Sequence, residues 1–248
     1  MGDKKEKYPS VRKITQKEHI EIVREIFSTI TDRYDFLNHF LSLRRDIAWR
    51  RFAVKKMHFK NTGRLLDVAC GTCDVALYAA ETYPEIKVFC LDFVHKMLEA
   101  GSIKIVERGM SHRIHLIRGD GCLLPFSDNS FDVAVVAFGI RNIPDKKMAL
   151  SEMTRVVVPQ GQIMVLEMAF TKNWFSNLLY RFYLNCILPC LARWFSKNYK
   201  AYHYLADSIM NFPGPEDFKK MMEASGMEDV KVYKLTFGIT YLFSGTKK

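Results

Sequence analysis

The sequence contains no apolar run long enough to cross a membrane as a helix. A spanning helix needs roughly 20 mainly apolar residues, and the nearest candidate, residues 182–195, is interrupted by Asn185, Pro189 and Arg193. The N-terminal stretch MGDKKEK is charged and lacks the apolar core of a secretion signal. We therefore expect a cytoplasmic protein without a transmembrane helix.

The chain also lacks a linker rich in proline, glycine or serine, and it has no internal repeat. Because 48% of its 248 residues are apolar, a single domain over residues 1–248 with a sizeable core accounts for the whole length. Lysine and arginine outnumber aspartate and glutamate by 37 to 27, a net charge of +10. This excess favours a polyanionic partner, either nucleic acid or an anionic membrane surface.

Cysteine is sparse, with six residues at positions 70, 73, 90, 122, 186 and 190. Cys70 and Cys73 form a CxxC pair, the spacing of a redox centre or of half a zinc site. No second CxxC follows, and the other cysteines lie in apolar stretches. Without a secretion signal we expect reduced thiols, and we predict no metal site.

Apolar strands alternate with helical segments through most of the chain. The predicted strands are residues 64–69, 86–91, 114–118, 131–138, 162–167, 230–234 and 239–244, and the predicted helices are 16–30, 46–57, 74–83, 94–108, 146–157 and 215–225. This alternation indicates a doubly wound, Rossmann-like α/β fold with a mostly parallel sheet of seven strands that ends in an antiparallel hairpin. Residues 14–58 and an aromatic insertion at about 172–212 are expected to form a helical cap.

Four strand ends carry polar or turn-forming residues in a suggestive order. In a doubly wound sheet, ligands bind outside the carboxyl ends of the strands. A tight turn lets backbone N–H groups approach a ligand carboxylate, and an acidic residue at the next strand end can accept hydrogen bonds from ribose hydroxyls. The strand ends, in chain order, are Cys70-Gly71-Thr72, Asp92-Phe93, Asp120-Gly121 and Ala137-Phe138.

The cofactor that fits this series best is S-adenosylmethionine (AdoMet). A GxGxxG loop is absent, and Gly71 alone remains of the three glycines, so the pyrophosphate of NAD would be poorly held. AdoMet has no phosphate to hold. An ordinary helix cap or turn explains each residue alone, but not the four strand ends together.

The residues resemble the UbiE/MenG-type methyltransferases of menaquinone and ubiquinone biosynthesis, which are class I AdoMet-dependent enzymes. The resemblance runs from about residue 27 to the C-terminus. It is carried by YDFLN at 34–38, LDVACGT at 66–72, FGIRN at 138–142 and YLADSI at 204–209. It implies methyl transfer from AdoMet to a ring carbon of a polyprenyl demethylquinol. The sequence departs from the family pattern at Cys73, which replaces a glycine, at Asp46, which replaces a histidine, and at His203, which replaces an arginine.

Three residues are predicted to act on the acceptor. C-methylation needs electron density on the ring carbon, so a ring hydroxyl must lose its proton. Arg141 stays protonated and suits a phenolate, although a loop ion pair would also explain it. Asn142 could orient the same oxygen or cap a helix, and Tyr34 could contact the acceptor or only the cofactor. The general base remains open between His203, Asp46, His39 and a water molecule.

The predicted partners follow from the insertion and the charge. Aromatic side chains interspersed with basic ones in residues 172–212 suit either a cap core, a dimer seam, or an interfacial segment that admits a prenyl tail from the inner face of the membrane. We therefore expect a polyprenyl quinol, a peripheral membrane surface and a homodimer or quinone-biosynthetic assembly. RNA is not expected, because an Asn-Pro-Pro-Tyr loop and an appended RNA-binding module are absent. Another lipid acceptor, or a non-catalytic AdoMet- or quinone-binding role, stays open as the alternative.

Overall fold

The computed structural model describes residues 10–11, 14–169 and 200–248, so most of the predicted insertion 172–212 lies outside the described residues. Its centre is a seven-stranded sheet in the order β3-β2-β1-β4-β5-β7-β6. β7 is antiparallel to β5 and β6, and the other neighbours are parallel. This confirms the predicted fold. The strands are β1 (Arg64–Val68), β2 (Lys87–Asp92), β3 (Ile114–Arg118), β4 (Phe131–Ala137), β5 (Val157–Met168), β6 (Met227–Leu235) and β7 (Thr240–Lys247).

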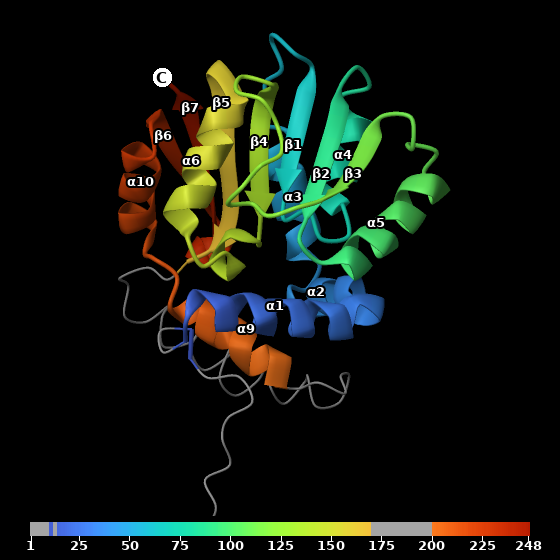
Figure 1. The fold of residues 1–248 in the computed structure, drawn as a ribbon, viewed down its shortest axis with the longest axis vertical. Coiled ribbons are helices and arrows are strands. Elements are labelled where there is room, and N and C mark those ends of the chain that lie inside the picture. The colour runs from blue at the N-terminus through green and yellow to red at the C-terminus, as the bar shows by residue number, and fades with distance from the viewer. Residues whose placement is uncertain (1–9, 12–13, 170–199) are drawn as a thin grey trace, which may run out of the picture.

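Helices cover both faces of the sheet (Figure 1). The helices on the sheet are α3 (Arg45–Val54), α4 (Asp74–Thr82), α5 (His95–Glu107), α6 (Lys146–Val156) and α10 (Pro215–Ala224). In β4, Val133 and Val135 pack into one core with α3 and α4, whereas Ala134 and Val136 pack into the other with α6 and α10. Because both faces are covered, β4 reads as a nearly continuous apolar run.

A helical cap lies beyond the carboxyl ends of the parallel strands (Figure 1). It consists of α1 (Gln16–Ile30), α2 (Tyr34–Leu41) and α9 (Lys200–Met210). Thr15 and Glu18 form a capping box that fixes the start of α1. The helix α3, which falls within the predicted cap segment 14–58, instead buries Trp49 and Ala53 against α4 and the sheet.

The cap helices are held to each other and to the sheet by specific contacts. His19 on α1 lies 2.7 Å from the hydroxyl of Tyr204 on α9, and Ile26 packs against the same tyrosine. The Arg24 guanidinium lies 4.6 Å from the ring centroid of Phe93, which follows β2. The cap is therefore fixed over the strand ends. Among the helices that the structure describes, none has the length and apolarity needed to span a bilayer.

Candidate active site

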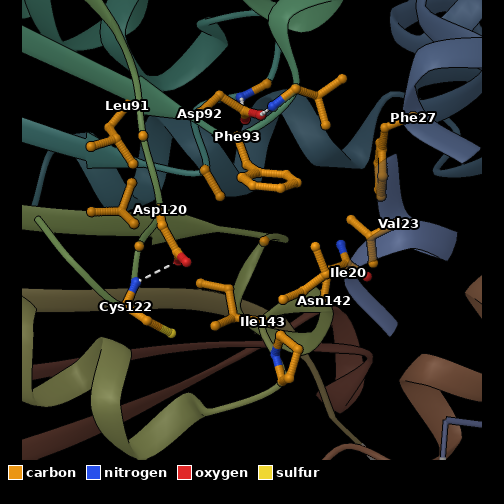
Figure 2. Close-up of a pocket in the computed structure, with 18 of the residues that line it drawn as sticks. Ile20, Val23, Phe27, Leu91, Asp92, Phe93, Asp120, Cys122, Asn142 and Ile143 are labelled. Atoms are coloured by element: carbon orange, nitrogen blue, oxygen red, sulfur yellow. Dashed lines mark hydrogen bonds between the residues drawn. The ribbon is translucent and has the colours of Figure 1, made fainter. Parts of the chain in front are cut away.

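A cavity of about 400 Å³ opens where β1, β2, β3 and β4 end beneath the cap. This volume lies in the range of small-molecule sites. Its floor carries strand-end residues, among them Gly71, Asp92 and Asp120, and α1 contributes Ile20, Val23 and Phe27 from the opposite side (Figure 2). The cavity therefore has a polar side at the sheet and an apolar side at the cap.

Asp92 organises the polar side. One of its carboxylate oxygens accepts the backbone N–H of Gly71 and the other accepts that of Val94, each at 2.8 Å. Burial raises the pKa of Asp92 to about 6, against the lowering effect of these two hydrogen bonds. A carboxylate offers about four lone pairs, so after these bonds roughly two remain for a ligand.

The backbone at the first and fourth strand ends is unusually compact. Ala69, Gly71 and Phe138 have φ values of 51°, 56° and 58°, the left-handed region that costs a non-glycine residue of order 1 kcal/mol or more. A Cβ at Gly139 would lie 2.7 Å from the Cβ of Ala69. The two loops therefore touch, and they hold the cavity floor in a conformation that local sequence preference would not adopt.

The third strand end supplies an acidic group on a second wall. Asp120 accepts the backbone N–H of Cys122 at 2.8 Å, and Figure 2 shows its carboxylate on the cavity side. A Cβ at the neighbouring Gly121 would lie 3.1 Å from the Cδ1 of Ile143. Asp120, Gly121, Phe93, Ala137 and Phe138 all line the cavity, as the sequence predicts for cofactor-binding residues.

Two predicted cofactor residues lie outside the cavity wall that the structure describes. Thr72 is buried, and its hydroxyl donates to Asp35 on α2 at 2.6 Å and accepts from the Lys104 ammonium at 3.2 Å. Lys104 also pairs with Asp35 at 3.0 Å and with Asp74. Thr72 therefore ties the first turn to α2. The Cys70 side chain lies beside Cys73 instead, with 3.8 Å between their sulfur atoms.

Tyr34 and Asn142 both line the cavity, as predicted. The ring of Tyr34 packs edge-on to Phe27 with 5.9 Å between centroids, and it lies next to Gly71. Burial raises the pKa of the Tyr34 hydroxyl, so this group stays protonated at neutral pH and can donate a hydrogen bond. The Asn142 side-chain oxygen accepts from the Tyr204 hydroxyl at 3.3 Å.

Arg141 is placed differently from the other two predicted catalytic residues. Its guanidinium forms an ion pair of 2.5 Å with Glu167, and both side chains are buried. It borders a second cavity of about 280 Å³, together with His19 and Lys146. Gln16 and Pro144 line both cavities, so the two adjoin. The loop ion pair left open by the sequence is therefore present.

Sequence reasoning missed Glu167 as a partner of the site. The Glu167 carboxylate accepts hydrogen bonds from the Arg141 guanidinium and from two backbone N–H groups. These are the N–H of Arg141 at 3.3 Å and the N–H of Met168 at 2.9 Å. The sequence does show an acidic residue at the end of the predicted strand 162–167, the same position that Asp92 holds on β2, and this could have indicated a role for Glu167 at the site. Its pairing with Arg141 could not be read from the spacing.

Asp46 and His39, two of the candidate general bases, do not line the larger cavity. Asp46 accepts hydrogen bonds from His39, Ser42 and Arg50 at 2.8, 2.6 and 2.6 Å, so it is the centre of a structural network. Its pKa is lowered because the hydrogen bond from Ser42 and the nearby Arg50 and His39 outweigh its burial. The side chain of His203 lies outside the described residues.

Comparison with known proteins gives one consistent answer. A model described as the ubiE/COQ5 methyltransferase family matches residues 13–247. The ubiquinone/menaquinone biosynthesis C-methyltransferase UbiE of Geotalea daltonii is 41% identical over 95% of this chain and 99% of its own length. The demethylmenaquinone methyltransferase of Geobacillus stearothermophilus is 38% identical over 92% and 97%.

Solved structures support the fold. The phosphoethanolamine N-methyltransferase 2 of Haemonchus contortus, in complex with AdoMet, aligns with a TM-score of 0.65 at 14% identity, covering 94% of this chain and 60% of that one. A possible histamine N-methyltransferase from Thermotoga maritima aligns at 0.61 and 21% identity, covering 91% and 99%. The fold, the strand-end cavity and the two long alignments agree: this chain is a methyltransferase that belongs to the ubiE/COQ5 methyltransferase family.

Proposed function

We propose that this enzyme methylates a ring carbon of a polyprenyl demethylquinol with AdoMet as the methyl donor. Demethylmenaquinol is the first acceptor to test, and the benzoquinol of the ubiquinone pathway is the second. The observation that carries the proposal is a single cavity with polar strand ends on one side and Ile20, Val23 and Phe27 on the other. The names of the relatives, which specify these two pathways, support the choice of acceptor.

The polar side of the cavity fits AdoMet. The remaining lone pairs of Asp92 would accept the ribose hydroxyls, the turn at Gly71 would face the methionine carboxylate, and Asp120 would accept the adenine amino group. Phe93 lies on the same wall, where it would pack against the adenine ring. When bound, AdoMet supplies an electrophilic methyl group and its own leaving group.

The chain's part in the reaction is to hold the acceptor ring and to favour its phenolate form. The protonated hydroxyl of Tyr34 can donate to a ring oxygen, and Asn142 lies on the same cavity wall. The positive charge of Arg141 acts to lower the pKa of both Tyr34 and Tyr204. We infer that the same charge would favour the phenolate form of an acceptor bound beside Tyr34. Among the described residues, its buried Nε has no hydrogen-bond partner.

The ion pair with Glu167 determines which variant gives a clean test. Replacing Arg141 by alanine would leave the fully buried Glu167 carboxylate without its partner, a change that costs roughly 3–5 kcal/mol of folding free energy. Loss of activity in that variant would therefore not separate catalysis from folding. Tyr34→Phe removes one hydroxyl and leaves the ring packing with Phe27 in place.

We predict that labelled methyl groups pass from AdoMet to chemically reduced demethylmenaquinol in detergent, and not to the oxidised quinone, which has no ring hydroxyl to ionise. Tyr34→Phe should lower kcat by about 10- to 100-fold, the loss of one hydrogen bond to a charged oxygen, with little change in AdoMet affinity. Tyr78→Phe, a matched change on α4 away from the cavity, should retain activity. AdoMet binding without transfer to any reduced quinol would refute the acceptor.

We also propose that the cap meets its acceptor at a membrane surface. Phe36 and Phe40 on α2 stack on each other and are 55% and 38% exposed, and the following Leu43 is 83% exposed. Arg44 and Arg45, both exposed, come next. Apolar side chains bordered by basic ones are the composition of an interfacial helix on anionic lipid, and the net charge of +10 agrees with this.

The membrane proposal is tested by sedimentation with lipid vesicles. The protein should bind vesicles that contain phosphatidylglycerol more tightly than pure phosphatidylcholine. Leu43→Ser should weaken this binding by roughly 10- to 150-fold, because it removes apolar surface worth roughly 1.5–3 kcal/mol when buried in lipid. Ile103→Ser, at a comparably exposed site on α5, is the matched control. Equal binding to both lipids by all three proteins would argue against α2 as the contact.

A further inference from the structure

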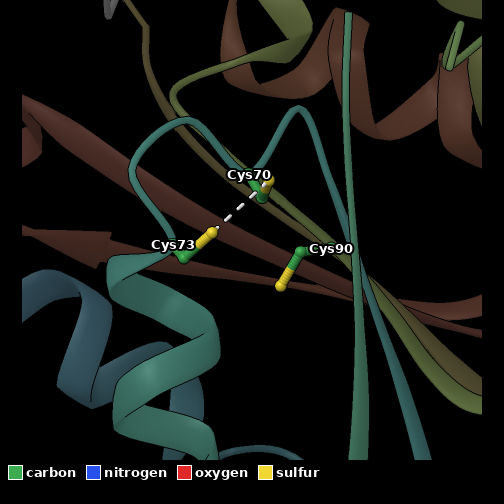
Figure 3. A group of neighbouring side chains, drawn as sticks. All are labelled: Cys70, Cys73 and Cys90. Atoms are coloured by element: carbon green, nitrogen blue, oxygen red, sulfur yellow. Dashed lines mark hydrogen bonds between the residues drawn. The ribbon is translucent and has the colours of Figure 1, made fainter. Parts of the chain in front are cut away.

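Three cysteine side chains meet beneath the first turn of the active site. The sulfur atoms of Cys70, Cys73 and Cys90 all lie within 4.8 Å of one another, and those of Cys70 and Cys73 are 3.8 Å apart (Figure 3). The three thiols are free. The sequence prediction of no metal site set the other cysteines aside because they lie in apolar stretches, and it did not anticipate that β2 brings a third sulfur to the CxxC pair.

The cluster has the dimensions of a metal site with three sulfur ligands. A metal–thiolate bond is about 2.3 Å long, so three sulfurs around one ion in a plane are about 4 Å apart. The observed 3.8 Å between Cys70 and Cys73, and the 4.8 Å limit for the group, are close to this spacing. Shifts of at most about 1 Å would bring the sulfur atoms to the spacing of a three-coordinate metal site.

Rigid elements hold the three sulfurs in place. Cys90 lies in the middle of β2, paired in register with Asp67 of β1 and Leu116 of β3. Cys73 precedes α4, and its sulfur packs so closely on α5 that a Cβ at Gly101 would lie 2.6 Å from it. Cys73 and Cys90 are fully buried, whereas Cys70 is partly exposed and gives a route by which an ion can enter.

Cys73 occupies a backbone position that favours another residue. Its φ of 66° lies in the left-handed region, where glycine is strain-free and a side chain is not. The chain therefore has a cysteine side chain at a position where the backbone conformation favours glycine. Packing against Gly101 accounts for the burial of Cys73 but not for the choice of a sulfur.

The surroundings favour a soft cation with three ligands. Among the described residues, the group contains no fourth histidine, cysteine or carboxylate ligand, whereas structural zinc takes four. Soft thiolate ligands suit copper(I), zinc and iron–sulfur clusters, and since zinc sites and iron–sulfur clusters take four protein ligands, a group of three thiolates favours copper(I). On the adjacent strand, Asp67 is buried, and its Oδ2 has no hydrogen-bond partner within the described part of the chain.

We propose that Cys70, Cys73 and Cys90 form a trigonal thiolate site for one copper(I) ion. Each thiol loses its proton to solvent as its sulfur–copper bond forms, and the copper keeps its +1 charge, so no oxidant or reductant takes part. The site lies under the turn that contains Gly71 but does not depend on the proposed methyl acceptor. A measurement of metal binding therefore tests it without any assay of methyl transfer.

The experiment uses the full-length chain with Cys122, Cys186 and Cys190 changed to serine, so that only the three clustered thiols remain. The reduced protein is titrated under anaerobic conditions with copper(I) held by bicinchoninate. It should remove one copper(I) per chain from the chelator, give thiolate-to-copper charge-transfer absorption, and show three sulfur ligands by X-ray absorption spectroscopy.

The key variant is Cys73→Gly in the same background, because glycine suits the φ of 66° and should keep the protein folded. It should weaken copper binding by more than the ~10- to 100-fold that loss of an outer-shell contact costs, while the thermal unfolding midpoint stays at or above that of the parent. Failure of the parent to take copper from the chelator would overturn the proposal. So would equal binding by the folded Cys73→Gly variant, or a preference for four-coordinate zinc.

Discussion

At the scale of single residues, Asp92 has a structural role, and we propose that it also binds the cofactor. Its two oxygens hold the backbone N–H groups of Gly71 and Val94, which fixes the first turn against the start of α5. Asp92 also lines the cavity. A buried carboxylate with this arrangement is costly to the fold, and binding of a polyhydroxyl ligand offsets that cost.

We predict that Asp92→Asn weakens AdoMet binding by roughly 10- to 100-fold, because hydrogen bonds to a charged group contribute about 1.5–3 kcal/mol. The asparagine keeps the shape of the side chain and one of its two backbone contacts, so the fold should survive. Isothermal titration calorimetry with AdoMet measures the change. Glu99→Gln, an exposed residue on α5, is the control. Unchanged affinity in Asp92→Asn would remove Asp92 from the cofactor site.

Residue-level prediction from sequence succeeds where a side chain's role follows from its strand end. Gly71, Asp92 and Asp120 are brought together because parallel strands present their carboxyl ends at one edge of the sheet. The sequence did not predict the partners of Thr72 and Arg141, because Asp35 and Glu167 are 37 and 26 positions away. No periodicity or motif spacing encodes such pairs, since they depend on how the cap and β5 pack.

At the scale of elements, the docking of α1 on α9 depends on a neutral histidine. Burial lowers the pKa of His19 from 6.5 to about 4, and the nearby Lys146 adds to this effect. The same ring is 2.7 Å from the Tyr204 hydroxyl. Between pH 4 and 6.5 the unfolded chain binds a proton at His19 that the folded chain does not. The unfolding free energy is therefore unaffected by this proton above pH 6.5, and it falls as the pH drops from 6.5 toward 4.

We therefore predict that the wild-type protein loses more unfolding free energy between pH 7 and 5 than His19→Gln does. The difference should be about 1–2 kcal/mol, the linkage expected when a histidine must be neutral to fold. Urea unfolding at the two pH values measures it. The control His112→Gln, at an exposed position, should behave as wild type. Equal losses in wild type and His19→Gln would show that this contact does not govern acid stability.

The elements themselves could be predicted well where periodicity is strong. The bounds predicted for α1 and β3 agree with the structure, because each has a clear apolar pattern. The helix α2 was missed, since its short polar and aromatic sequence gains its stability from buried Leu37 and from Asp35 bonding across to Thr72. β5 begins at Val157, five positions before its predicted start, because Pro159 and Gly161 suggest a break that the sheet accommodates as an irregularity in register.

At the scale of the whole molecule, the cap and the sheet each contribute one side of the cavity. The sheet supplies the acidic side chains Asp92 and Asp120 at the ends of β2 and β3, and α1 supplies apolar side chains on the opposite side (Figure 2). A donor and an acceptor held in one such space react as if at very high concentration. The combination suits a reaction that joins a polar methyl donor to an apolar ring.

The most direct measurement is the position of the transferred methyl group. The protein is incubated with AdoMet labelled in its methyl group and with chemically reduced demethylmenaquinol, and the product is analysed by mass spectrometry and nuclear magnetic resonance. The account predicts that the label is bonded to a carbon of the quinol ring. A label on a ring oxygen, or no product while AdoMet is bound, would contradict it.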